Sequence, residues 1–162
     1  MIKERWEITV TGTVQGVGFR PFIYRLAERF ALSGWVLNGP QGVRIQVQGT
    51  ADSLRSFTEA IRSEAPDHAL IAALSYQTIP LADECNHFKI IESDTVGESS
   101  AAVPADLAAC PECLAEVMDP KDRRYRYAFA NCTHCGPRFT LLNNLPYDRP
   151  STSMTDFPMC EA

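Results

Sequence analysis

A short glycine-containing stretch near the amino terminus has the residue types of a phosphate-binding loop. It reads Val14-Gln15-Gly16-Val17-Gly18-Phe19-Arg20 and lies between a segment that alternates apolar and polar residues and a segment with helical periodicity. The glycines allow backbone N–H groups to turn toward one point, and the helix amino terminus adds partial positive charge there. Arg20 adds a full charge and a planar fork of donors. The alternative for this loop alone is a plain glycine turn beside a surface arginine, because short glycine patterns are weak evidence.

Four cysteines further along the chain form two Cys-x-x-Cys pairs with the spacing of a structural zinc site. Cys110 pairs with Cys113 and Cys132 pairs with Cys135, with residues 114–131 between them. Two such pairs direct four thiolates toward one ion, and a closed tetrahedron leaves no position for a substrate. The metal would also stabilise a segment that is too small and too poor in apolar residues to fold alone. The alternatives are redox disulfides or free thiols. We interpret His134 as a bystander or as a residue that supports the ligands without binding the metal.

The last cysteine stands apart from these pairs. The chain ends in Cys160-Glu161-Ala162, one residue short of another Cys-x-x-Cys. We therefore expect Cys160 to be an orphan ligand of a truncated second zinc module, in a fragment of a longer protein. The alternative is a natural end with an incidental cysteine.

The periodicities along the first half of the chain predict a β-α-β-β-α-β domain with one further short strand. We expect strands at about 6–13, 34–38, 43–49, 70–79 and 88–91, and helices at about 21–31 and from Asp52 or Ser53 to the turn before Pro66. This order is that of a ferredoxin-like fold, an antiparallel sheet with two helices on one face. The predicted class is therefore α+β. A domain at 1–92 is followed by a linker at 93–105, where small and polar residues lack periodicity, and by a zinc-finger module at 106–162.

The glycine loop and a second motif downstream resemble the acylphosphatase family. The second motif is Gly34-Trp35-Val36-Leu37-Asn38 followed by Gly42-Val43-Arg44-Ile45-Gln46-Val47-Gln48-Gly49, and the resemblance covers roughly residues 5–92. It implies that Arg20 and the loop amides bind the phosphate of an acyl phosphate, and that Asn38 orients the attacking water. The phosphate-binding residues implied are Gln15, Gly16, Val17, Gly18, Phe19 and Arg20.

Together with the cysteine region, these motifs resemble the amino-terminal part of the hydrogenase maturation carbamoyltransferases, the HypF family. The added motifs are Cys110-Pro111-Glu112-Cys113, Asn131-Cys132-Thr133-His134-Cys135-Gly136-Pro137-Arg138-Phe139 and Leu145-Pro146-Tyr147-Asp148-Arg149. The resemblance implies hydrolysis of the acyl phosphate bond of carbamoyl phosphate, as the first step of carbamoyl transfer for cyanide-ligand synthesis in nickel–iron hydrogenase. It also implies a zinc region with two metals, ATP-dependent domains further along the longer protein, and a maturation partner that accepts the carbamoyl group on a cysteine.

Composition narrows the remaining classes of function. The formal net charge of −5 gives no support for a nucleic-acid binder. No apolar run approaches the ~20 residues of a membrane span, and the first residues lack the apolar region of a signal peptide, so we predict a cytoplasmic protein. Two alternatives stay open: a stand-alone acylphosphatase, and a zinc ribbon that binds nucleic acid or protein through basic and aromatic residues at 121–127. Acidic residues outnumber basic ones across 103–162, which argues against nucleic acid.

Overall fold

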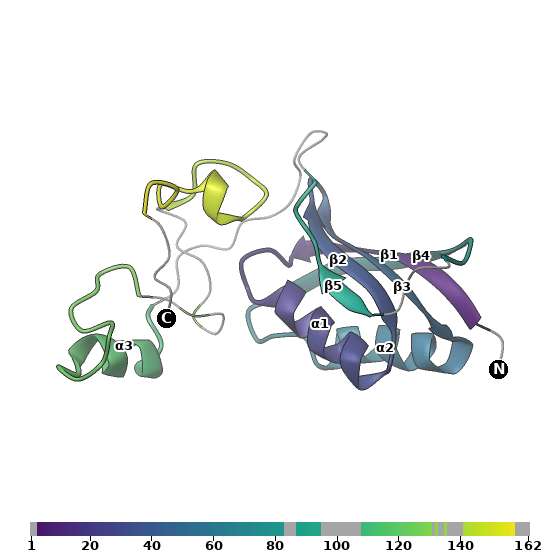
Figure 1. Ribbon diagram of the computed structural model, residues 1–162, viewed down its shortest axis with the longest axis horizontal. Coiled ribbons are helices and arrows are strands. Elements are labelled where there is room, and N and C mark those ends of the chain that lie inside the picture. The colour runs from purple at the N-terminus through teal and green to yellow at the C-terminus, as the bar shows by residue number, and fades with distance from the viewer. Residues whose placement is uncertain are drawn as a thin grey trace.

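A computed structural model describes residues 3–82, 87–94, 108–130, 132, 135 and 141–157 of the chain. Its first part is a twisted sheet with two helices on one face (Figure 1). The elements of this part are β1 (Lys3–Thr13), α1 (Phe19–Arg29), β2 (Ser33–Gly39), β3 (Gly42–Thr50), α2 (Ala51–Ser63), β4 (Leu70–Ile79) and β5 (Phe88–Ile90). Their order confirms the predicted α+β, ferredoxin-like class, including the further short strand.

The five strands lie in the order β4-β1-β3-β2-β5. The pairs β1–β3, β1–β4 and β2–β3 are antiparallel, as predicted. The pair β2–β5 is parallel, with Gly34 opposite Phe88 and Val36 opposite Ile90, so the expectation of a wholly antiparallel sheet is wrong at this edge. A three-residue strand carries too short a pattern to reveal the direction in which it will pair.

The core of this domain lies between the sheet and the two helices. Strands β1 and β3 contribute alternate residues to it, and α1 and α2 contribute one apolar face each, as their helical periodicity predicts. Its largest fully buried apolar side chains include Phe19, Phe57, Ile8, Ile23, Ile45, Leu54 and Ile61. This core fixes the ends of β1 and β2 and the start of α1, which carry the candidate site.

Both helices begin earlier than the sequence pattern indicated. Gly18 is the N-cap of α1 and has the left-handed φ of 74°, so the helix starts at Phe19 and takes Arg20 into its first turn. The N-cap of α2 is Thr50, whose Oγ1 accepts a hydrogen bond from the Ser53 amide at 3.2 Å. Asp52 and Ser53, at which the sequence pattern started this helix, therefore lie inside its first turn, and the threonine before them is the cap.

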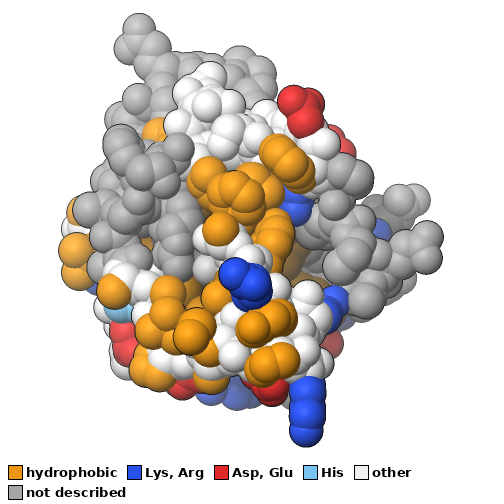
Figure 2. Space-filling model, turned by 90° about the vertical axis from the view of Figure 1, so that its left-hand side faces the viewer, with side chains coloured by type: hydrophobic (Ala, Val, Ile, Leu, Met, Phe, Trp, Pro, Cys, Tyr) orange, Lys and Arg blue, Asp and Glu red, His pale blue; other side chains and the backbone are white. Residues whose placement is uncertain are grey.

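Among its described residues, the second part of the chain includes the helix α3 (Pro111–Met118) and a short 3-10 helix, η2 (Arg149–Ser151). Its buried cluster consists of cysteines. Exposed hydrophobic side chains gather on the face that Figure 2 shows. The large hydrophobic residues exposed in this part of the chain are Leu114, Met118, Tyr125, Tyr127, Phe129 and Phe157. Within the described residues, no helix has both the length and the apolar character needed to cross a membrane.

The region predicted as a linker begins as an ordered continuation of β5. The Asp94 amide donates to the Asn38 carbonyl oxygen at 2.8 Å, and the Asp94 carboxylate lies 3.5 Å from Arg44. The predicted linker therefore begins with two residues that are hydrogen-bonded to the first domain: Ser93 accepts from Arg20, and the Asp94 amide donates to Asn38. The rest of that segment, His134 and Cys160 lie outside the described residues.

Candidate active site and cysteine cluster

The glycine loop connects β1 to the amino terminus of α1. Gly16 and Gly18 have φ values of 75° and 74°, a conformation that side-chain-bearing residues adopt only with strain. The apolar residues of the same loop, Val14, Val17 and Phe19, are buried in the core. The loop is thus anchored by its apolar residues and turned by its glycines. Its backbone enters the first turn of α1, where N–H groups have no acceptor within the helix.

The Gln15 side chain joins three segments of the chain. It is 1% exposed, and its Nε2 donates to the carbonyl oxygens of Gly39 at 2.8 Å and Gly42 at 3.0 Å. Its Oε1 accepts a hydrogen bond from the Tyr147 amide at 3.1 Å. The sequence pointed to Gln15 only for its backbone amide. The buried side chain that ties the loop to the β2–β3 turn has no signature in the sequence.

Arg20 and Asn38 come together at the mouth of the loop. Asn38 lies near the end of β2 and is 1% exposed. With the side-chain amide oriented so that its oxygen faces the guanidinium, Asn38 accepts from Arg20 Nη2 at 3.2 Å and from Nε at 3.3 Å. The two residues that the family motif named, one on α1 and one on β2, therefore form one polar site beside the glycine loop.

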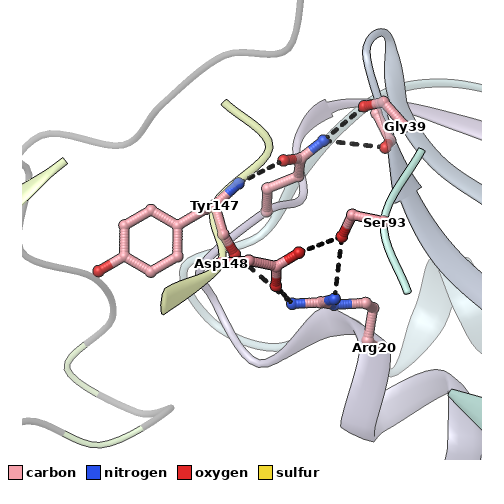
Figure 3. A network of polar contacts seen from close by, with 7 residues as sticks. Arg20, Gly39, Ser93, Tyr147 and Asp148 are labelled. Atoms are coloured by element: carbon pink, nitrogen blue, oxygen red, sulfur yellow. Dashed lines mark hydrogen bonds and ion pairs between the residues drawn. The ribbon is translucent and has the colours of Figure 1, made fainter. Parts of the chain in front are cut away.

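Arg20 has a further partner that the sequence did not indicate. Its Nη2 lies 2.5 Å from Asp148 Oδ1, and its Nη1 donates to Ser93 Oγ at 3.3 Å. The Ser93 hydroxyl in turn donates to the second carboxylate oxygen of Asp148. Figure 3 shows Arg20, Ser93 and Asp148 turned toward one another, with Tyr147 beside them. The motif containing Asp148 was visible in the sequence, but nothing in it indicated a contact with Arg20.

The four predicted zinc ligands also come together. The sulfur atoms of Cys110, Cys113, Cys132 and Cys135 all lie within 4.8 Å of one another. Individual Sγ–Sγ distances are 3.6 Å between Cys110 and Cys132 and 3.9 Å between Cys113 and Cys135. Four sulfurs at 2.3 Å from a tetrahedral ion would be about 3.8 Å apart, whereas a disulfide needs about 2.05 Å. The donor set fits a metal ion and contradicts the alternative of disulfides.

The helix α3 helps to build this cluster. Cys110 is its N-cap and Pro111 its first residue, so that Cys113 lies in the first turn and is directed back toward Cys110. Burial raises the pKa of the Cys113 thiol far above its ordinary value, and the hydrogen-bonded thiols of Cys110, Cys132 and Cys135 raise it further. The packing of Cys113 among these thiols therefore disfavours its ionisation, which a bound cation would reverse.

Comparisons with known proteins identify relatives of both parts of the chain. The family model described as Acylphosphatase matches residues 6–90. This chain belongs to the acylphosphatase family. Within the family, an acylphosphatase from Chlorobaculum tepidum is 35% identical over 92 residues, which are 56% of this chain and 99% of that protein. The solved acylphosphatase from Bacillus subtilis is 31% identical, with a TM-score of 0.51 over 56% of this chain and 99% of that one.

The similarity to longer proteins extends past the acylphosphatase-type domain. The family model described as HypF finger matches residues 109–142. Carbamoyltransferase HypF2 from Cupriavidus necator is 48% identical over 96% of this chain and 20% of that protein. A crystal structure titled full-length HypF in the phosphate- and nucleotide-bound form has a TM-score of 0.90 and 41% identity, over 99% of this chain and 21% of that one. The predicted resemblance to HypF is confirmed, and the chain spans about a fifth of the length of these relatives.

Proposed function

We propose that this chain hydrolyses the acyl phosphate bond of carbamoyl phosphate, as the first step of carbamoyl transfer in the maturation of nickel–iron hydrogenase. The observation that carries the proposal is the placement of Arg20 and Asn38 within hydrogen-bond distance of each other, beside a glycine loop at a helix amino terminus. The similarity to acylphosphatases supports the bond type, and the similarity to proteins named carbamoyltransferase HypF supports the carbamoyl group.

In this proposal the phosphoryl group binds in the loop. The backbone N–H groups of residues 15–20 and the Arg20 guanidinium donate to its oxygens, which neutralises charge and fixes the phosphorus for attack. The loop needs little rearrangement for this role, because its apolar residues are buried and Gln15 holds it to the β2–β3 turn. Preorganised donors of this kind act mainly by stabilising the charge of the transition state.

Asn38 would hold the water in line with the bond that breaks. The water oxygen attacks phosphorus, the bond from phosphorus to the carbamoyl oxygen breaks, and carbamate leaves. The proton of the water passes to an oxygen of the substrate phosphoryl group, and the second product is inorganic phosphate. A neutral amide serves this purpose well, since it can accept from Arg20 and donate to the water at the same time.

For the second part of the chain we propose a structural zinc site held by Cys110, Cys113, Cys132 and Cys135. The sulfur spacing near the tetrahedral value supports zinc, and four protein ligands leave no position for a substrate. The exposed apolar face beside it fits contact with the ATP-dependent domains of a longer protein. We also propose that a maturation partner accepts the carbamoyl group on a cysteine. The greater length of the relatives supports the presence of further domains in the longer protein.

The test is phosphate release from carbamoyl phosphate and acetyl phosphate. Arg20→Ala should lower kcat/KM by about 10²–10³, since it removes the charged donor to the transition state. The matched control is Arg55→Ala, which removes the same charge from the exposed face of α2. Asn38→Ala should lower kcat more than it changes KM, because its role concerns the water. Turnover like that of the wild type in folded Arg20→Ala would refute the assignment.

A further inference from the structure

The segment Leu145–Asp148, here called the strap, lies against the mouth of the phosphate loop. Contacts of its backbone and side chain hold it there. The Tyr147 amide donates to Gln15 Oε1 at 3.1 Å, and the Tyr147 carbonyl oxygen accepts from Arg20 Nη2 at 3.5 Å. The Asp148 carboxylate lies 2.5 Å from the same Arg20 Nη2. Both partners belong to the loop that is proposed to bind phosphate. The strap therefore follows the cysteine cluster in the chain and meets the active site in space (Figure 3).

All three guanidinium nitrogens of Arg20 have an acceptor in this arrangement. Nε and Nη2 donate to Asn38, Nη2 also meets Asp148, and Nη1 donates to Ser93. A bidentate phosphate contact uses two of these nitrogens. The phosphoryl group can take its place on Arg20 only if the Asp148 carboxylate gives up that nitrogen.

Charge makes coexistence unfavourable as well. The side chains of Arg20 and Asp148 are 22% and 26% exposed, so solvent screens them only in part. A carboxylate that stayed in contact while a phosphate dianion arrived would place like charges side by side, at an energetic cost that one guanidinium cannot offset for both. One cation thus has two anionic ligands that exclude each other.

We infer that Asp148 is a built-in competitor of the substrate: its carboxylate occupies the phosphate position on Arg20 and exchanges with the phosphoryl group at each binding event. The inference rests on the proposed function in taking Arg20 as the phosphate ligand. The exchange weakens the binding of every phosphate-bearing ligand, the product included. The returning carboxylate helps inorganic phosphate to leave, while Ser93 keeps the carboxylate near the site.

The experiment is titration of the full chain with inorganic phosphate, followed by calorimetry or NMR. Asp148→Asn keeps the shape of the side chain and removes its charge, so phosphate affinity should rise about five- to tenfold, as expected for the loss of a competing charge-assisted hydrogen bond. The matched control is Asp156→Asn, an exposed carboxylate in the same part of the chain, which should leave the affinity unchanged. Unchanged or weaker phosphate binding in Asp148→Asn overturns the inference. So does a loss of turnover at unchanged affinity, which would make Asp148 a catalytic base.

A second readout needs no variant at this position. In the wild-type chain, the side-chain carboxyl carbon of Asp148 and the Nε of Arg20 should shift along one saturation curve as phosphate is added. An Asp148 signal that stays still while Arg20 saturates overturns the exchange. The two proposals fail separately: tighter phosphate binding in Asp148→Asn without any acyl phosphate hydrolysis would leave the exchange standing and refute the proposed function.

Discussion

The two parts of this chain bury different kinds of side chain. The acylphosphatase-type domain packs the apolar faces of α1 and α2 against β1 and β3, with Phe57, Ile45 and many neighbours fully buried. In the described residues of the second part, the buried cluster consists of cysteines, and the aromatic side chains Tyr125, Tyr127 and Phe129 are exposed. The first part can therefore fold from its pattern of apolar residues alone, whereas we expect the second to depend on a bound ion.

The largest effect should therefore come from removing the metal. We expect one zinc per chain, because Cys110, Cys113, Cys132 and Cys135 complete one closed four-ligand site. Binding of structural zinc supplies on the order of 10 kcal/mol to small modules, so chelation should collapse the NMR signals of residues 108–130 and leave those of the sheet in place.

The same chelation experiment also tests whether the activity of the first part depends on the metal of the second. Acyl phosphate hydrolysis should persist after zinc is lost, because Arg20 lies on α1 and Asn38 on β2, both in the first domain. Activity that disappears with the metal would show that the two parts depend on each other more than their separate cores indicate.

The next largest effect should be on the free energy of unfolding, through the apolar core of the first domain. Phe57→Ala should lower the free energy of unfolding of the first domain by about 3–5 kcal/mol, since it leaves a cavity where a fully buried ring packed. Phe157→Ala is the matched control in the second part, where the ring is 55% exposed, and should change stability by less than about 0.5 kcal/mol. Denaturant unfolding followed by tryptophan fluorescence measures the first domain, which holds Trp6 and Trp35, and NMR signals of residues 141–157 follow the second part. Equal losses would contradict the contrast between the two regions.

The smallest effect comes from a surface ion pair of the first domain. Arg29 donates two hydrogen bonds to Glu64, at 2.7 and 2.8 Å, and these hold the pKa of the Glu64 carboxyl below its ordinary value of 4.5. A lowered folded-state pKa stabilises the fold above the pKa of the unfolded chain, and that stability is lost as the pH falls through the folded pKa.

Glu64→Gln should therefore lower the Tm slightly at neutral pH, and the difference from wild type should vanish in acid below the folded pKa of Glu64. Glu59→Gln, which changes an exposed carboxylate on α2, is the control. A Tm difference that is the same at all pH values would mean that the effect of Glu64 is not electrostatic.

The sequence was informative wherever a function depends on neighbours in the chain. The glycine loop, Arg20 in the adjoining turn and the paired cysteines all belong to short motifs, and the structure brings each set together. Asn38 was assigned by its place in a second motif, and the packing of β2 beside α1 brings its side chain within hydrogen-bond distance of Arg20. The helices and strands followed from apolar periodicity, because burial on one face of an element repeats regularly along the chain.

What the sequence did not reveal depends on contacts between distant segments. Arg20 and Asp148 are 128 residues apart, and no spacing or periodicity links them. The side-chain bonds of Gln15 to Gly39 and Gly42 were hidden for the same reason, since an isolated glutamine in a loop is usually exposed. The Thr50 cap was missed because the residues after it also have the chemistry of caps, and only the backbone geometry distinguishes them.

The parallel pairing of β5 with β2 has a consequence for everything that follows it in the chain. Because the two strands run in the same direction, β5 ends beside the end of β2 that carries Asn38, and the Asp94 amide bonds to the Asn38 carbonyl. An antiparallel β5 would have released the chain at the far end of the sheet. As built, any segment joined after residue 94 is tethered at the entrance of the phosphate loop. Even a weakly binding group there acts at the high effective concentration of an intramolecular ligand.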